Sequence, residues 1–242
     1  MRFNDREEAA HLLAQRLVKY RGLNPLVLAI PRGAVPMGKI IADSLGGELD
    51  VVLVRKLRAP GQRELAIGAV DEQGRVCFSE HARAMRISPD YLETEKEAQL
   101  EILRARRAAY TPLKRPADPR GRIVIVVDDG VATGATLIAA LRATRAAGPV
   151  KLVAAMAVAP RETFRKIAEE ADEIVCLEVP PVFYAVGEFF EDFSEVTDAE
   201  VVAILSLSGP RAAAPEEAAL RSDDTQGINT VPTLEWSFVV TF

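Results

Sequence analysis

The chain has 242 residues, of which 49% are apolar and 27% charged, enough for one sizeable α/β domain or two small ones. Its formal net charge of −5 argues against general affinity for a nucleic-acid backbone, which needs clustered Lys and Arg, so nucleic acid is not an expected partner. No apolar run approaches the roughly 20 residues of a membrane span, and the polar, acidic start MRFNDREEAA is unlike a signal peptide.

The first part of the chain alternates predicted helices and strands. Asn4, followed three residues later by Glu7, is typical of a helix capping box. The apolar run 26–30 predicts a buried strand that ends in the turn Pro31-Arg32-Gly33, and residues 36–45 predict a helix. A second apolar run, residues 50–54, predicts another buried strand, which Arg55 and Lys56 close.

The middle of the chain breaks this alternation. Residues 57–78 hold short alternating pieces around Pro60-Gly61 and Gln73-Gly74, which predicts a loop and a hairpin. Ser88-Pro89 then opens a long charged helix to about Tyr110, for which a solvated face is a simpler interpretation than a partner-binding role. The alternation resumes with strands at 123–128, 152–159 and 173–177, helices at 136–147 and 161–170, and a last helix with the capping box Thr197 and Glu200.

This order of elements predicts an α/β fold with a Rossmann-like open, mostly parallel sheet and helices on both faces. The domain should span residues 1–205, with an inserted loop, hairpin and helix at about 57–112. Residues 206–242 begin as a polar, irregular segment, which predicts a linker or a poorly ordered tail. Cys77 and Cys176 lie far apart without CxxC spacing, so we expect reduced, buried thiols in a cytoplasmic protein.

The stretch IVIVVDDGVATGAT, residues 123–136, places two acids and several small residues directly after a buried strand. Ligands of open parallel sheets bind beyond the carboxyl ends of the strands. Small residues before a helix expose backbone N–H groups that can surround a phosphate, and Thr136 can also cap the helix. The predicted phosphate-binding residues are Gly130, Val131, Ala132, Thr133, Gly134, Ala135 and Thr136.

Asp128 and Asp129 lie too close to such a phosphate to bind it, but they can accept hydrogen bonds from nearby hydroxyls. A ligand with a phosphate at one end and a diol close by is a ribose 5-phosphate. Two other phosphate sites do not fit, because the stretch contains neither Gly-Lys-Ser/Thr nor GxGxxG. The plain alternative is a strand-to-helix turn with a solvated acidic pair.

The same stretch closely resembles the signature for 5-phosphoribosyl 1-diphosphate (PRPP) in type I phosphoribosyltransferases. IPRGAVP, DVVLVRKL and ELAIGAVDEQG, in this order, resemble a bacterial branch of that family known only as predicted phosphoribosyltransferases. The resemblance extends to about Leu205. It implies that Asp128 and Asp129 bind the ribose hydroxyls and that the loop 130–136 holds the 5-phosphate.

The resemblance also implies a Mg²⁺-dependent transfer of the phosphoribosyl group from PRPP to a nucleobase or related acceptor, with release of diphosphate. Arg32 and Gly33 correspond to the diphosphate loop, and Arg55 and Lys56 to further basic contacts near the leaving group. Mg²⁺ would bridge the ribose hydroxyls and the diphosphate, held mostly by substrate oxygens and water. Residues 57–71 correspond to a mobile loop that closes over the substrate. Members of the family usually form dimers, so the resemblance also implies a possible homodimer.

The acceptor is less well defined. Enzymes for 6-oxopurines carry a carboxylate where this chain has Ala132, which argues against a usual hypoxanthine or guanine enzyme. Residues 179–196 loosely resemble the hood that covers the base. Phe183 or Tyr184 could stack on a ring there, with core packing as the alternative, and Asp192 could help a second Mg²⁺.

Two other functions stay open. A non-catalytic protein of the same fold could sense PRPP or a nucleotide, although Arg32, Arg55 and Lys56 favour the enzyme. An enzyme that forms PRPP would need an ATP site, and those enzymes are longer chains with paired domains.

Overall fold

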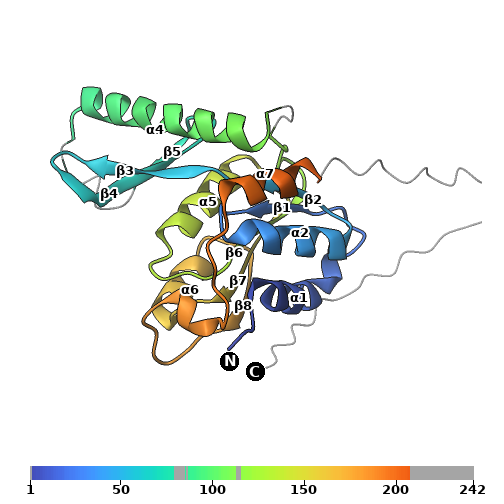
Figure 1. Ribbon diagram of the computed structural model, residues 1–242. Helices are drawn as coiled ribbons and strands as arrows, with labels where there is room; N and C mark the ends of the chain where they lie inside the picture. Colours follow the sequence, from blue (N-terminus) through green and yellow to red (C-terminus); the bar gives the residue numbers. More distant parts are fainter. Residues whose placement is uncertain (1, 79–84, 86, 113–115, 208–242) are drawn as a thin grey trace, which may run out of the picture. The chain divides into compact units, whose positions relative to one another are not determined.

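The computed structural model describes residues 2–207, except for positions 79–84, 86 and 113–115 (Figure 1). The chain separates into two units, Met1–Pro210 and Arg211–Phe242, and every described residue belongs to the first. The predicted tail therefore lies outside the described residues from position 208 onward.

Five parallel strands form the central sheet, in the order β2-β1-β6-β7-β8. β1 pairs with β6, from Leu26 opposite Val124 to Ala29 opposite Val127, so the two strands end at the same edge of the sheet. The strands are β1 (Leu26–Ala29), β2 (Glu48–Val51), β6 (Ile123–Asp128), β7 (Lys151–Val158) and β8 (Glu173–Glu178). This arrangement confirms the predicted open, parallel α/β fold.

Helices cover both faces of this sheet (Figure 1). One face packs against α1 and α2, and the opposite face against α5 and α6. Neighbouring strand residues divide between these two cores: Val27 and Ile125 face the first, Leu26 and Val124 the second. The helical segments in and around these layers are α1 (Arg6–Arg16), η1 (Val18–Tyr20), α2 (Ala34–Leu45), α5 (Ala135–Ala146), α6 (Arg161–Ala168), η2 (Val186–Phe189) and α7 (Asp198–Ser206).

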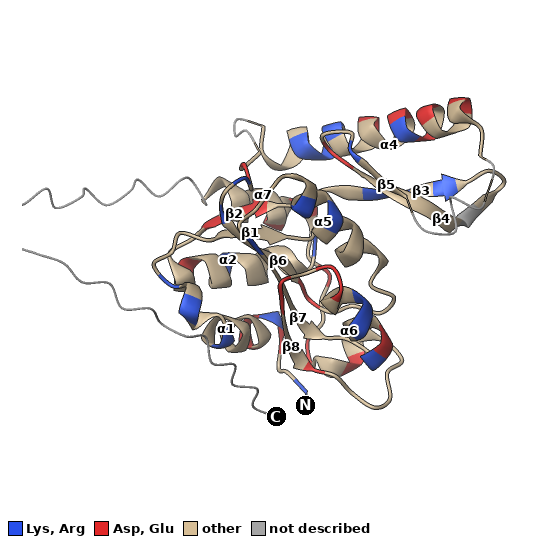
Figure 2. Ribbon diagram, turned by 180° about the vertical axis from the view of Figure 1, so that it is seen from behind, with Lys and Arg blue, Asp and Glu red and all other residues tan. Residues whose placement is uncertain are grey.

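A second, antiparallel sheet carries the strand order β3-β4-β5. It consists of β3 (Val54–Ala59), β4 (Gln62–Asp71) and β5 (Val76–Phe78). The long helix α4 (Pro89–Tyr110) packs against β3 and β4, while α5 also contacts this sheet. Figure 1 shows α4 running alongside the strands, and Figure 2 shows that acidic and basic residues both occur along it.

The predicted strand 50–54 is not one strand. The chain leaves the central sheet after Val51 and enters the antiparallel sheet at Val54. Arg55 and Lys56 therefore lie inside β3 instead of closing a parallel strand, and that prediction was wrong. Residues 57–71, predicted to form a loop, belong mostly to β3 and β4, with the turn between them at Pro60-Gly61.

Several helix ends follow their sequence signals. Ser88 caps α4, and the capping box of Thr197 and Glu200 begins α7, as predicted. The first helix begins one residue later than predicted, because Asp5 is its cap and not Asn4. Likewise, α2 already begins at Ala34 and contains the proline that was predicted to start it.

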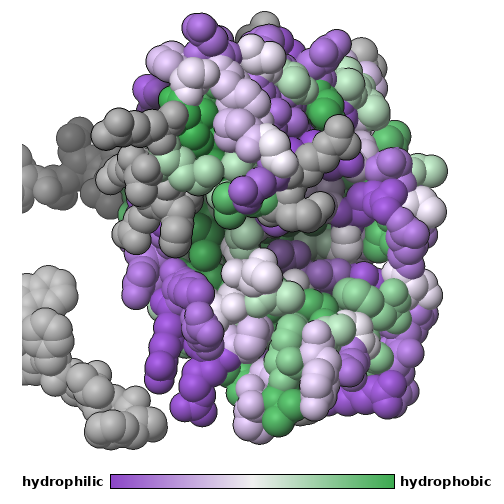
Figure 3. All heavy atoms as spheres, turned by 90° about the vertical axis from the view of Figure 1, so that its left-hand side faces the viewer, coloured by the Kyte–Doolittle hydropathy of each residue, from purple (hydrophilic) through white to green (hydrophobic). Residues whose placement is uncertain are grey.

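The surface of the first unit mixes residue types. On the face shown in Figure 3, hydrophilic and hydrophobic residues are interspersed. Within the described ranges, none of the helices has both the length and the apolar character needed to cross a membrane. Cys77 and Cys176 are free thiols and both are half-buried, so the buried position predicted for them is reached only in part.

Candidate functional site

The acidic pair lies at the carboxyl end of β6. Asp128 is the last residue of the strand, and its Oδ1 accepts a hydrogen bond from the Asp129 amide at 3.0 Å. The Asp129 carboxylate turns towards α1, where its Oδ2 accepts a hydrogen bond from Nε of Arg6 at 2.9 Å. A Cβ atom on Gly33 would lie only 2.1 Å from that same Oδ2. The loop after β1 therefore touches the acidic pair, and only glycine permits this approach.

Asp128 is costly to ionise. Burial raises the pKa of its carboxyl group well above the usual value, the neighbouring Asp129 raises it further, and the hydrogen bond from the Asp129 amide offsets part of the increase. An anion at this position destabilises the folded protein unless a cation or a hydrogen-bond donor comes close to it. A buried carboxyl group with such a pKa is a candidate for binding a ligand.

We therefore expect Asp128→Asn to raise the thermal stability of the ligand-free protein at neutral pH. A raised pKa means that the folded state binds the proton more tightly than the unfolded state, so this group's cost is full above its folded-state pKa. The cost disappears as the pH falls towards the ordinary Asp value of about 4. The gap in melting temperature between the variant and the unchanged protein should therefore shrink on acidification.

Asp172→Asn is the matched control, and its expected effect on folding stability has the opposite sign. Hydrogen bonds from Arg145 and from the Leu152 amide lower the pKa of Asp172. That carboxylate stabilises the fold above the ordinary Asp value, and its contribution is lost as the pH falls through its lowered pKa. Thermal unfolding at several pH values checks both variants, and a destabilising Asp128→Asn at neutral pH would contradict the cost assigned to that group.

The small-residue loop between β6 and α5 is closely packed. A Cβ atom on Gly130 would lie 2.4 Å from Cγ1 of Val186, so the segment that contains η2 rests directly on the loop. Gly134 has φ +77° and is the N-cap of α5, a backbone conformation that glycine adopts without strain. The predicted cap at Thr136 is therefore wrong, because that residue lies within the helix.

Most amides of this loop remain available. Val131 is an exception, because its amide donates to the Val158 carbonyl at 2.9 Å. Among the described residues, no acceptor serves the amides of Ala132, Thr133 and Gly134. The first amides of α5 follow, and a helix leaves these without intrahelical partners. Such a run of amides at a helix amino terminus is suited to binding an anion.

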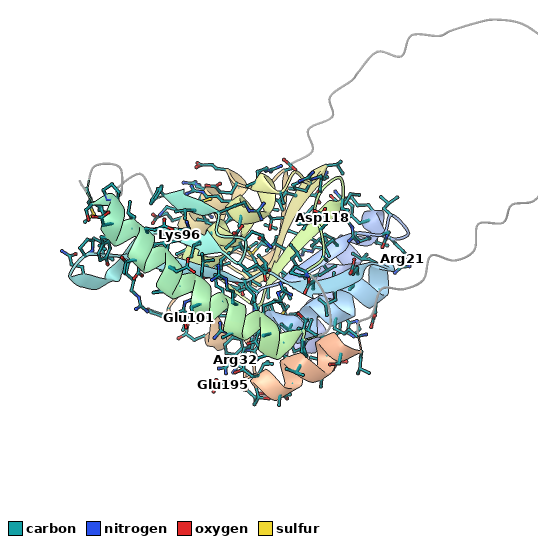
Figure 4. All side chains as sticks on the ribbon, turned by 90° about the horizontal axis from the view of Figure 1, so that it is seen from above. Arg21, Arg32, Lys96, Glu101, Asp118 and Glu195 are labelled. Carbon is teal, nitrogen blue, oxygen red and sulfur yellow. The ribbon has the colours of Figure 1, made fainter. Side chains whose placement is uncertain are left out.

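Arg32 lies in the loop after β1, next to Gly33. Its guanidinium pairs with the carboxylate of Glu195, and a second carboxylate, that of Asp198, lies 3.8 Å away. In Figure 4 the labelled side chains of Arg32 and Glu195 lie beside each other near α7. Both carboxylates are largely exposed, and exposed ion pairs contribute only about 0–1 kcal/mol. A phosphorylated ligand could therefore displace them from Arg32 at low cost.

Arg55 and Lys56 point to opposite faces of β3, as successive strand residues do. Nε of Arg55 donates to Oε1 of Gln99 on α4 at 2.6 Å. Burial lowers the pKa of Arg55, and the nearby charges of Arg106 and Arg58 lower it further. Lys56 is exposed and borders a cavity of about 220 Å³ between the antiparallel sheet and α5. The two cations therefore do not converge on one point.

The predicted hood residues are spread along an irregular segment. The ring of Phe183 stacks on Phe189, with centroids 5.7 Å apart, whereas Tyr184 is 80% exposed. Asp192 accepts hydrogen bonds from the amide and the hydroxyl of Ser194, which lower its pKa. Phe183 thus already has a packing partner, and Tyr184 is the ring that is open to a ligand.

Sequence reasoning missed the charged partners of this site. Arg6 contacts the acidic pair from the first turn of α1, and Glu195 and Asp198 contact Arg32 from the segment before and at the start of α7. The sequence contained only one weak indication of these partners, at Arg6. A cation in the first turn of a helix, as at Arg6, is disfavoured by the helix dipole and therefore calls for a nearby anion.

Comparisons with known proteins identify the family and support the fold of this chain. A Mycobacterium tuberculosis protein named "putative phosphoribosyl transferase", found in two strains, is 41% identical over 204 residues, or 84% of this chain. This match covers 46% of the relative, so the chain spans about half of that protein's length. A crystal structure of the protein TT1426 from Thermus thermophilus is 45% identical, with a TM-score of 0.79 over 86% of this chain and 99% of that one. The family model "Phosphoribosyl transferase domain" matches residues 4–193, and the chain therefore belongs to the phosphoribosyl transferase domain family.

Proposed function

We propose that this chain binds PRPP with Mg²⁺ and transfers the phosphoribosyl group to a nucleobase or a related acceptor, releasing diphosphate. One observation carries the proposal: the acidic pair, the open amides before α5 and the loop of Arg32 and Gly33 meet at one edge of the sheet. The acidic pair matches the ribose diol of PRPP, the open amides match its 5-phosphate, and the loop of Arg32 and Gly33 matches its diphosphate.

In this proposal, the protein's own groups stabilise the charges that develop during transfer. The acceptor nitrogen forms a bond to the anomeric carbon of the ribose, while the bond from that carbon to the diphosphate oxygen breaks. The ribose becomes cation-like and the leaving group gains negative charge. Asp128 and Asp129 stabilise the sugar, and Arg32 with the Gly33 backbone stabilises the diphosphate. The amides of residues 130–136, except that of Val131, hold the 5-phosphate.

The donor set fits Mg²⁺. Asp128 and Asp129 each keep one carboxylate oxygen that has no hydrogen-bond partner within the described part of the chain. Hard cations prefer such oxygens, and Mg²⁺ usually keeps several substrate and water ligands. When bound, Mg²⁺ would offset the negative charge of the diphosphate and polarise the ribose hydroxyls. The proposal assigns the exposed Asp192 to a second Mg²⁺, as one of its oxygen ligands.

Roles for the remaining cations and rings belong to the same proposal. Lys56, which is exposed, would contact the diphosphate, and Arg55 would contribute if it exchanged its bond to Gln99 for the ligand. Tyr184, more than Phe183, would stack on the acceptor. The free thiols support our expectation of a cytoplasmic protein, and a homodimer stays a prediction.

The test is a panel of nucleobases and related acceptors, each incubated with Mg²⁺-PRPP and assayed for diphosphate release. We expect calorimetric binding of Mg²⁺-PRPP, and release with at least one acceptor. The variant Asp128→Asn with Asp129→Asn serves as the inactive control. A protein that does not bind Mg²⁺-PRPP contradicts the proposal altogether.

A sensor that binds PRPP without transfer is the second candidate. The engagement of Arg55 by Gln99 favours it, because a sensor has less need of cations at a leaving group. Tight binding combined with no diphosphate release from any acceptor would select this candidate.

A further inference from the structure

Arg6 lies where three segments of the site meet. Its Nε donates to Oδ2 of Asp129 at 2.9 Å, and its Nη1 donates to the carbonyl of Ser194 at 2.8 Å. The guanidinium carbon lies 3.8 Å from the centroid of the Phe193 ring, a cation–π contact. A Cβ atom on Gly33 would lie 3.3 Å from Nη2 of the same guanidinium. Arg6 therefore touches the acidic pair, the loop after β1 and the segment before α7.

This ion pair differs from the one at Arg32. The side chains of Arg6 and Asp129 are only 14% and 15% exposed, whereas the carboxylate partners of Arg32 are mostly exposed. The Ser194 carbonyl and the Phe193 ring also hold the guanidinium, so its orientation does not depend on the bond to Asp129 alone. The bond uses one carboxylate oxygen and leaves Oδ1 of Asp129 without a partner among the described residues.

We propose that Arg6 is a positioning residue of the sugar-phosphate site. It holds the Asp129 carboxylate so that its second oxygen is presented to the ribose hydroxyls, and it supplies positive charge beside two neighbouring acids. This role rests on the proposed binding of PRPP. Without Arg6, the carboxylate of Asp129 loses the hydrogen bond that sets its orientation, and a polyanionic ligand must approach an acidic pair that has lost its countercharge.

A purely structural role does not account for these contacts. Backbone hydrogen bonds already join the amino-terminal segment to the segment before α7: the Phe3 amide donates to the Phe189 carbonyl, the Glu191 amide to the Phe3 carbonyl and the Asp192 amide to the Asn4 carbonyl, each at 2.8 Å. None of these bonds involves the side chain of Arg6. Residues 189–192 should therefore stay in place when that side chain is changed.

The test compares Arg6→Met, Arg6→Lys and Arg16→Met by calorimetry with Mg²⁺-PRPP. Methionine keeps most of the apolar stem and removes the charge. Lysine keeps the charge but cannot donate to Asp129 and Ser194 in the same fork geometry. Arg16 is the matched control, because it lies in the same helix and donates to the Cys176 carbonyl at 3.1 Å.

We expect Arg6→Met to weaken binding roughly 10- to 100-fold, the usual effect of losing a residue that orients a ligand-binding side chain. Arg6→Lys should recover part of that loss, and Arg16→Met should bind like the unchanged protein. Amide hydrogen exchange over residues 189–192 in the ligand-free protein should be the same in Arg6→Met as in the unchanged protein.

Three results would overturn the positioning role while leaving PRPP binding intact. They are an Arg6→Met variant that binds as tightly as Arg16→Met or more tightly, an Arg6→Lys variant with no recovery, and a loss of affinity that comes with lost exchange protection at 189–192. If the unchanged protein itself does not bind Mg²⁺-PRPP, the proposed function fails, and this role fails with it.

Discussion

Asp128→Asn combined with Asp129→Asn is expected to remove measurable binding of Mg²⁺-PRPP from a protein that remains folded. Each carboxylate is proposed to accept a hydrogen bond from the ribose diol. A hydrogen bond to a charged group contributes about 1.5–3 kcal/mol, so the loss of two corresponds to roughly 100- to 10,000-fold in affinity. The variant also loses the negative charge that would attract Mg²⁺ and stabilise a cation-like ribose.

The fold should tolerate this double change. Asp128 carries a raised pKa, so the neutral amide removes an electrostatic cost at that position. The amide oxygen of an asparagine at position 129 can still accept the hydrogen bond from Nε of Arg6. Calorimetry with Mg²⁺-PRPP and a thermal unfolding curve together separate lost binding from lost structure.

Asp43→Asn is the matched control for the double variant. Asp43 is an exposed carboxylate on α2 that pairs with Lys39 one turn earlier, so its loss should leave affinity unchanged. If the double variant bound Mg²⁺-PRPP as tightly as Asp43→Asn, the sugar contact would have to lie elsewhere, and the acidic pair would be an ordinary strand end.

The fold was predictable where the sequence carries its own signals. The strand β6 is an apolar run flanked by Gly and two acids, and α4 begins after a Ser-Pro pair. The split between β2 and β3 was not predictable in the same way. Val52 and Leu53 continue the apolar run, so nothing in the local pattern shows that the chain changes sheets there. The turn residues at Pro60-Gly61 suggested a loop, although they only join two longer strands.

The candidate site also has a part that the sequence could locate and a part that it could not. The acids and small residues of 128–136 form one contiguous motif, so the sequence was sufficient to locate them. Arg6 is 123 positions from Asp129, and Glu195 is 163 positions from Arg32. Such pairs arise only when the sheet brings loops together and the segment before α7 returns to the amino terminus, and no local spacing encodes that return.

Arg107→Met is expected to be the most destabilising of the substitutions considered, by about 3–5 kcal/mol, because it leaves a buried carboxylate without its countercharge. Nη1 of Arg107 donates to Oδ1 of Asp50 at 2.7 Å, Nε to Oε2 of Glu72 at 2.6 Å, and Nη2 to the carbonyl of Val51 at 2.9 Å. Asp50 is almost fully buried in β2, and its Oδ2 also accepts the Ala117 amide at 2.8 Å. Burial lowers the pKa of Arg107, but the hydrogen bonds and charges of Glu72 and Asp50 outweigh it and raise the pKa overall.

This network joins α4 to the central sheet at β2 and to Glu72, directly after β4. Arg104→Met is the matched control: Arg104 lies one turn earlier on α4 and forms an exposed pair with Glu97, a kind of pair that contributes about 0–1 kcal/mol. Urea unfolding should therefore show a large loss for Arg107→Met and almost none for Arg104→Met. Adding Asp50→Asn to Arg107→Met should recover part of the loss, because the unpaired buried charge is then gone. Equal stability of the two single variants would show that α4 is held to the sheet by apolar packing alone.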